Sequence, residues 1–226
     1  MLQLQQRGEF MHHILKKNPL FKNLTEQELD QFIACQKPRV MTYQAKQTVF
    51  HKYERLTEIG IVIAGEILLV KEDFFGNESI IQNMTKGQSF GEAIALHPNE
   101  TTRVRAVAKE MTVVAFFNIQ GFYALCAKAC DYHQKIQQNL MLVLASKLVS
   151  LHKKIDVMSK RTIREKLLDY LSQLSQDKES IVTIPYTRQE LANYLNVDRS
   201  ALAREMRFMI DEGLIEVNKQ TIILKR

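Results

Sequence analysis

The sequence predicts an α+β fold, in which a β-rich segment is flanked by helices and followed by a long helix and a winged helix-turn-helix. Short runs of Val, Ile and Phe separated by glycines fill residues 38–118. Apolar residues at helical spacing return in residues 120–158, and a pair of capped amphipathic segments followed by a hairpin pattern ends the chain. Several short strands at close spacing are typical of a β-sandwich or barrel. A chain of 226 residues accommodates one large domain or two modest ones.

The first expected element is helical and covers residues 9–37. Within it, Thr25 and Glu28 have the spacing of a capping box, in which each side chain accepts a hydrogen bond from the backbone N–H of the other residue. A helix is therefore expected to begin directly after Thr25.

The β-rich segment contains runs that are apolar, rich in β-branched residues and short enough to be strands. We expect strands at Thr48–Phe50, Ile59–Ile63, Ile67–Val70, Ile80–Asn83 and Thr112–Phe117. Gly76 and Asn77 lie between two of these runs and indicate a hairpin turn, because both residue types accept positive φ.

Residues 120–158 carry an apolar seam whose members alternate at spacings of three and four. This is the a/d pattern of a coiled coil, and its members are Met141, Leu144, Leu148, Leu151, Ile155 and Met158. A helix packed only on its own domain would also show apolar spacing, so the seam packs either within the chain or against a second copy. Its regularity favours self-association, and because it is short we expect a dimer helix to lean on the β-rich domain as well.

Residues 159–226 form a third block with the pattern of a winged helix. We expect a helix at Arg164–Leu174 and a short strand at Ser180–Pro185. Thr187 and Glu190 repeat the capping-box spacing, so another helix is expected to begin at Thr187.

The helix that follows is expected to present arginines to solvent. Asn196 tolerates the left-handed backbone of a tight turn, and Asp198 is a good N-cap, which leaves Arg199, Ser200 and Arg204 within the first two helical turns. The N-terminal residues of a recognition helix contact base edges in the major groove. A plain amphipathic helix pair shows the same apolar spacing, but the caps and the arginines favour a helix-turn-helix.

The end of the chain indicates a wing. Gly213 is suited to stop the second helix, and Ile215–Asn218 and Thr221–Leu224 flank a two-residue turn that contains Lys219. A basic residue at such a tip is placed to meet a DNA phosphate.

Taken in this order, the parts resemble the Crp/Fnr family of bacterial transcription regulators. The resemblance lies in KGQSFGEAIAL at 86–96, TRQELANYLNVDRSALAREM at 187–206 and EGLI at 212–215. It implies an N-terminal cyclic-nucleotide-binding-type β jelly roll in residues 9–132, a dimerisation helix in residues 133–158 and a winged helix-turn-helix in residues 159–226. The protein it implies is a homodimeric, effector-responsive regulator that binds an inverted-repeat operator, with no catalytic residues.

The resemblance also implies which residues contact DNA. Arginine suits guanine, because its fork donates to both O6 and N7. Ser200 stands where well-known members often carry a glutamate, which accepts from cytosine N4, so the familiar half-site is not expected. Arg207 either meets phosphate or lies on a solvated helix face. The full set is Thr187, Arg188, Gln189, Asp198, Arg199, Ser200, Ala201, Arg204, Arg207 and Lys219.

In the sensor part, the resemblance implies an effector pocket at Gly91, Glu92, Ala93, Thr101, Thr102, Leu151 and His152. Cyclic-nucleotide-binding members hold the cyclic phosphate with an arginine followed by Ser or Thr, and those positions carry Glu100 and Thr101 here. Because glutamate repels an anionic phosphate, we do not expect cAMP, and the small-molecule effector is left open. The alternative is an effector-independent DNA-binding regulator with a vestigial pocket. No cofactor is required.

Cysteines leave a metal role open without favouring it. Cys126, Cys130 and His133 have the spacing of a soft metal site or redox pair, while small buried thiols are the simpler interpretation. Iron–sulfur members of the family use an N-terminal cysteine cluster, but only Cys35 lies in the first hundred residues.

Histidines give two further alternatives. By analogy with gas-sensing relatives, His12 and His13 are either haem ligands or exposed residues that precede an amphipathic helix. A cupin-like metal enzyme is the competing class, but it needs a cluster such as two histidines and a carboxylate. The β-rich segment offers only His51 and His97, which are far apart in sequence. We therefore expect no metal site.

Composition limits the partners. The formal net charge of +6 favours polyanions. The N-terminal residues lack the apolar core of a signal peptide, no stretch reaches the roughly 18 apolar residues of a membrane helix, and three cysteines fit a reducing compartment. We expect a cytoplasmic protein without membrane contact, whose partners are double-stranded operator DNA, a second copy of the chain and RNA polymerase.

Overall fold

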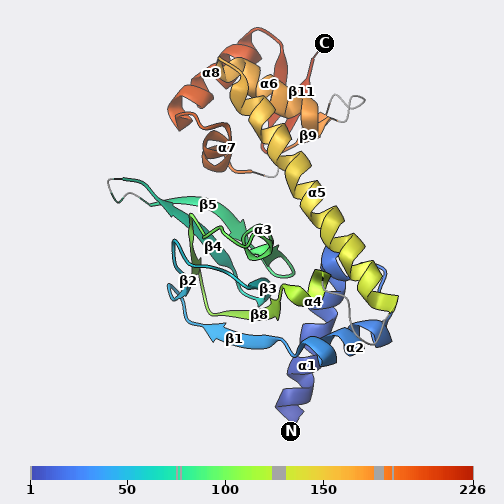
Figure 1. Ribbon diagram of the computed structural model, residues 1–226. Coiled ribbons are helices and arrows are strands. Elements are labelled where there is room, and N and C mark those ends of the chain that lie inside the picture. Colours follow the sequence, from blue (N-terminus) through green and yellow to red (C-terminus); the bar gives the residue numbers. More distant parts are fainter. Residues whose placement is uncertain are drawn as a thin grey trace. The chain divides into compact units, whose positions relative to one another are not determined.

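The computed structural model describes residues 2–74, 76, 78–123, 131–175, 181–184 and 186–225, and these form two compact units (Figure 1). The first unit is Met1–Leu144 and the second is Ala145–Arg226. The long helix α5, Asp131–Ser159, begins in the first unit and ends in the second.

The first unit is built on two four-stranded antiparallel sheets. One sheet has the order β1 (Arg39–Tyr43), β8 (Thr112–Asn118), β3 (Glu58–Ala64) and β6 (Ser89–Phe90). The other has the order β2 (Thr48–Phe50), β7 (Arg105–Ala108), β4 (Ile67–Glu72) and β5 (Glu78–Met84). Each strand expected from the sequence is present, and β1, β6 and β7 are additional. Gly76, with φ +82°, lies in the β4–β5 turn as expected, while Asn77 lies outside the described residues.

The expected helical region 9–37 is divided into three pieces: α1 (Leu2–Lys17), the 3₁₀ turn Pro19–Phe21 and α2 (Glu26–Gln36). Asn18 ends the first piece, because its side chain accepts from the N–H of Leu20 and caps the following turn. The capping box at Thr25 is confirmed: the Thr25 hydroxyl accepts from Glu28 N at 3.2 Å, and the Glu28 carboxylate accepts from Thr25 N at 2.8 Å.

The β3 and β8 strands bury both of their faces, because successive side chains point to opposite sides of a sheet. One face packs on the helices, including α4 (Gln120–Tyr123) and the start of α5, around the rings of Phe21, Phe32, Phe117 and Phe122. The other face packs between the sheets, where Phe90 lies 6.1 Å from Phe50 and 6.4 Å from Phe116, measured between ring centroids.

A glycine makes room for this second cluster. A Cβ atom added to Gly60 would lie 2.3 Å from Cζ of Phe90, so the Phe90 ring rests directly on the β3 backbone. Phe90 is 3% exposed and has packed neighbours on its other sides. The ring immediately precedes Gly91 and α3 (Glu92–Leu96), so this contact also positions that segment.

The second unit contains the end of α5, α6 (Ile163–Leu174), β9 (Ile181–Thr183), α7 (Arg188–Leu195), α8 (Arg199–Asp211), β10 (Ile215–Asn218) and β11 (Thr221–Leu224). The three strands form one sheet in the order β10, β11, β9. The expected winged helix-turn-helix is confirmed, including both wing strands, and Gly213 has the positive φ expected where α8 ends. Ser180 and Pro185, the ends of the expected strand, lie outside the described residues.

We predict that Gly60→Ala destabilises the first unit by about 1–3 kcal/mol, because the added methyl overpacks the buried cluster at Phe90. Urea unfolding of the variant should show a lower midpoint with an unchanged slope.

The matched control is the double variant Gly60→Ala/Phe90→Leu. If the clash with the ring is the cause, the double variant loses less stability than the two single variants do in sum. Strictly additive losses would contradict this explanation.

Candidate DNA-binding surface and sensor domain

The helix-turn-helix owes its local geometry to caps at each joint. Thr187 accepts from Glu190 N at 3.3 Å, and the Glu190 carboxylate accepts from Thr187 N at 2.8 Å, which begins α7. Asn196 ends α7 with φ +51°. Asp198 then begins α8, because its Oδ1 accepts from Ser200 N at 2.8 Å and from Ala201 N at 3.0 Å. These features agree with the predicted turn.

The α8 helix has one buried and one exposed face. Leu202, Met206 and Met209 lie in the core of the second unit. The exposed face carries Arg199, Ser200, Ala203, Arg204 and Arg207, and Ala201 is half-buried. Three positive charges therefore lie on the solvent-facing side of the predicted recognition helix.

A side chain from α6 holds α8 in place. Arg164 donates from Nε to Glu205 at 2.6 Å, and from Nη1 and Nη2 to the two oxygens of Glu212 at 2.7 and 2.8 Å. The bidentate arrangement fixes both the position and the orientation of the partner carboxylate. Arg164 also neutralises two carboxylates on a helix that would otherwise repel a polyanion.

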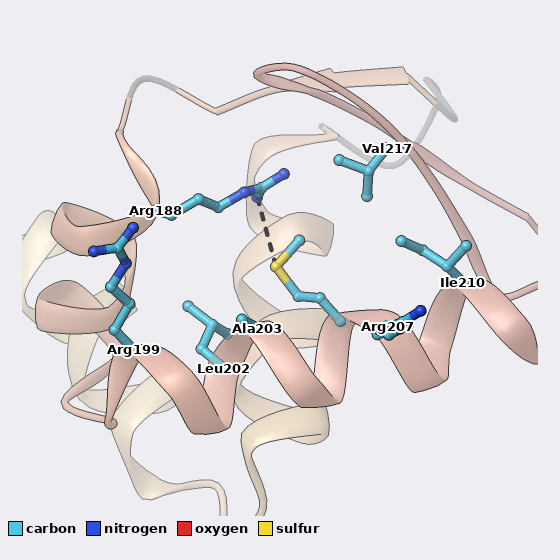
Figure 2. Close-up of a pocket in the computed structure, with 8 residues that line it drawn as sticks. Arg188, Arg199, Leu202, Ala203, Arg207, Ile210 and Val217 are labelled. Atoms are coloured by element: carbon cyan, nitrogen blue, oxygen red, sulfur yellow. Dashed lines mark hydrogen bonds between the residues drawn. The ribbon is translucent and has the colours of Figure 1, made fainter.

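A depression of about 240 Å³ lies between the exposed face of α8 and the wing (Figure 2). Its lining combines arginine and apolar side chains: Arg188, Arg199, Leu202, Ala203, Met206, Arg207, Ile210 and Val217. In Figure 2, Arg188 extends across the face of α8, and Val217 points toward the helix from the wing.

Arg188, the first residue of α7, contacts both α8 and the turn between β10 and β11. Its Nη1 lies 3.5 Å from the sulfur of Met206, and its Nη2 donates to the backbone carbonyl of Lys219 at 3.3 Å. Burial lowers the pKa of Arg188 from its usual value. The guanidinium is therefore engaged with the wing tip, whereas Gln189 is exposed and donates to Asn193 at 3.1 Å.

Lys219 lies at the wing tip. It is exposed and has φ +55°, in the two-residue turn between β10 and β11. Its exposed position at the tip of the wing agrees with the position expected from the sequence.

The predicted seam lies on the exposed side of α5. Met141, Leu148, Leu151, Ile155 and Met158 have exposed fractions between 39% and 62%. Leu144 differs, because it is half-buried against the core of the first unit. Exposed Leu142 and Val149 widen the apolar surface beyond the predicted seam.

The predicted pocket residues of the first unit lie around α3. Gly91 has φ +89° and precedes the buried Glu92, while Ala93 is exposed. Thr102 is buried, and its hydroxyl donates to the carbonyl of His51 at 2.7 Å, so it stabilises the preceding loop. Thr101 is half-buried.

The remaining predicted pocket residues, Leu151 and His152, are exposed on the part of α5 that belongs to the second unit. Glu100, at the position expected for a phosphate-binding arginine, is exposed.

The proposed metal ligands are placed as follows. Cys126 and Cys130 lie outside the described residues, and Cys35 is an exposed free thiol. His12 has Nδ1 3.2 Å from Glu26 and Nε2 3.1 Å from Asp30. Throughout the described part of the chain, no group of three or more His, Cys, Asp or Glu side chains is arranged to hold a metal ion.

None of the helices in the described ranges has both the length and the apolar character needed to cross a membrane.

Comparison with known proteins assigns both units. The cyclic nucleotide-binding domain family matches residues 40–129, and the Crp-like helix-turn-helix domain family matches residues 165–226. The cAMP-activated global transcriptional regulator CRP of Haemophilus influenzae is 25% identical over 187 residues, which cover 80% of this chain and 82% of the relative.

Solved structures share the fold. The catabolite activator protein of Thermus thermophilus gives a TM-score of 0.55 at 21% identity, covering 92% of this chain and 94% of that one. The c-di-GMP responsive global regulator CLP of Xanthomonas campestris gives a TM-score of 0.60 at 17% identity, and the match covers 89% of this chain and 100% of that one.

A cyclic nucleotide-binding domain followed by a helix-turn-helix domain defines a class of DNA-binding transcription regulators rather than enzymes. This chain belongs to the Crp/Fnr family of that class.

Sequence reasoning missed the residues that support the DNA-binding surface. The sequence pattern predicts Arg164 only as the first residue of a helix, and it does not predict that Met206 and Val217 line the depression. The only sequence signal is that Glu205 and Glu212 are seven residues apart, about two helical turns, and therefore lie on the same side of the helix.

We predict that Arg164→Ala lowers the melting temperature at neutral pH, and that this difference from the wild type shrinks below about pH 4.5. The hydrogen bonds from Arg164 hold the pKa of Glu212 below its usual value of 4.5. A carboxyl with a lowered folded pKa contributes stability above 4.5 and loses it as the pH falls through the folded value. Thermal unfolding from pH 7 to pH 3 measures the difference.

Arg164→Lys is the control, because it keeps the charge but cannot form the bidentate contact. It should recover only part of the loss. A difference that stays constant over the whole pH range would show that the carboxylates are not the partners that matter.

Proposed function

We propose that the protein is a homodimeric, effector-responsive regulator that binds a specific inverted-repeat operator, and that it acts in the cytoplasm together with RNA polymerase. The observation that carries the proposal is the exposed arginine face of α8, whose opposite face is buried in the second unit. Arg199 and Arg204 are the base-reading arginines, and Lys219 and Arg207 are phosphate contacts.

The exposed apolar seam of α5 supports a dimer. Large aliphatic side chains rarely stay more than half exposed along one face of a helix unless another surface covers them. The alternation of three and four matches the seam between two paired helices. A second copy of the chain presents the same seam, so the pairing is self-complementary.

Dimerisation determines the form of the operator. Two α8 helices related by a two-fold axis enter successive major grooves about 34 Å apart, which corresponds to half-sites about 10 bp apart. Each half-site then contains the same sequence in opposite orientation.

The effector is a small molecule other than a cyclic nucleotide. Glu100 stands where a cyclic phosphate would need a cation, and a carboxylate repels such a group. Regulators that share this fold differ in their ligands: CRP is described as cAMP-activated, CLP as c-di-GMP responsive, and a solved structure of CprK as complexed with OCPA, so the fold does not prescribe a cyclic nucleotide.

An effector-independent regulator is the second candidate, and Phe90 is the observation in its favour. The Phe90 ring fills the space over Gly60 between the two sheets, which leaves less room for a ligand in the interior of the first unit. Native mass spectrometry of the freshly purified chain separates the two candidates, because a retained effector adds its mass to the dimer.

We predict that selection from a random duplex pool enriches an inverted repeat, and that Arg204→Ala relaxes one base pair in each half-site. A bidentate arginine–guanine contact contributes about 1–3 kcal/mol of discrimination. Competition binding with operators altered at single positions measures the loss.

Arg207→Ala is the comparison variant. As a phosphate contact, its loss weakens all sequences evenly and lowers the salt slope by about one. If Arg204→Ala behaves in the same way, Arg204 is not a base contact. If no inverted repeat is enriched, the proposed function is wrong.

We predict that Leu148→Glu yields monomers with weak operator binding, because two carboxylates then face each other across the seam. Sedimentation velocity measures the oligomeric state. The matched control is Ser150→Glu, because Ser150 lies about 200° around α5 from Leu148 and therefore outside the seam. It adds the same charge and should leave the dimer intact. A stable dimer of Leu148→Glu would show that the seam is not the interface.

A further inference from the structure

The hydroxyl of Ser200 already donates a hydrogen bond within the first turn of α8, to the side chain of Asp198. Its Oγ lies 2.5 Å from Oδ1 of Asp198, the oxygen that also accepts from the N–H groups of Ser200 and Ala201. These hydrogen bonds, with the Ser200 side chain foremost, hold the pKa of Asp198 below its usual value. An ionised carboxylate only accepts, so the proton in this contact belongs to Ser200.

This hydrogen bond changes the donor and acceptor capacity that the Ser200 hydroxyl offers to a ligand. A free serine hydroxyl either donates or accepts, and it therefore discriminates poorly between bases. With its single proton turned toward Asp198, Ser200 presents only acceptor lone pairs on its exposed side. It lies in the first turn of α8 between Arg199 and Arg204, in the part of a recognition helix that faces base edges.

The major groove distinguishes base pairs by the position of their one amino donor. That donor is N6 of adenine in an A·T pair and N4 of cytosine in a C·G pair, both on the first strand as written. In T·A and G·C pairs the first strand presents O4 of thymine or O6 of guanine, which are acceptors. An acceptor fixed over one strand therefore accepts A or C and opposes T or G.

We propose that Ser200 is a specificity-determining residue that reads one base of each half-site as amino or keto, admitting A and C on the contacted strand and disfavouring G and T. This inference rests on the proposed operator binding. It differs from the arginine contacts, since each arginine selects a single base and Ser200 selects a pair.

The test is selection from a random duplex pool with the full-length chain, carried out in parallel with Ser200→Ala and Ser200→Thr. The wild type should enrich one position per half-site that contains A and C on the same strand, with a preference of about two- to tenfold over G and T. Ser200→Thr keeps a hydroxyl next to Asp198 and should keep the preference. Ser200→Ala should accept all four bases there, while the guanines read by arginine stay unchanged.

Three outcomes overturn the proposal. Identical position preferences for the wild type and Ser200→Ala would show that Ser200 reads no base. An even loss of affinity across all sequences in Ser200→Ala would assign the residue to a phosphate. A single enriched base, or G and T together, at the position that Ser200→Ala affects would show a donor or another contact. Absence of any inverted repeat with the wild type refutes the operator binding on which the inference rests.

Discussion

The burial of one face of α8 determines the chemistry of the other face. Leu202, Met206 and Met209 are fixed in the core of the second unit, and a helical repeat of 3.6 residues then places Arg199 and Arg204 toward solvent. The caps at both ends of the turn fix where α8 begins, and Arg164 fixes it from the side. A surface that reads DNA needs this rigidity, because a side chain must reach a base edge within hydrogen-bond distance.

The first unit is subject to a related constraint. Its β3 strand buries side chains on both faces, so Gly60 is needed on one face to admit the ring of Phe90. Phe90 is followed directly by Gly91 and α3, so the packing of this ring also fixes where that segment begins.

The sequence predicted local structure well where one short-range interaction decides the outcome. Capping boxes at Thr25 and Thr187 and the left-handed Asn196 follow from side chains within a few residues of each other. It predicted less where several strands must first assemble: β1 is mostly exposed and lacks a clear alternation, and β6 has two residues. The division of region 9–37 depends on Asn18, which caps the 3₁₀ turn, and on Pro19, the first residue of that turn. An Asn-Pro pair is a sequence signal for such a break, but the prediction of one continuous helical region did not use it.

In the candidate DNA-binding surface, too, local features are predictable from the sequence and long-range contacts are not. Motif and spacing predict the arginines of the recognition helix, but the partners of Arg164 and Arg188 lie 18 to 48 residues away in sequence. Ser200 marks the difference most clearly. Its replacement of a glutamate suggests lost selectivity from sequence alone, yet the contact with Asp198 removes the donor role and leaves the acceptor polarity that a glutamate would have. The exchange thus keeps the same hydrogen-bonding sense while removing one negative charge from a surface that meets phosphates, which favours binding to the polyanion.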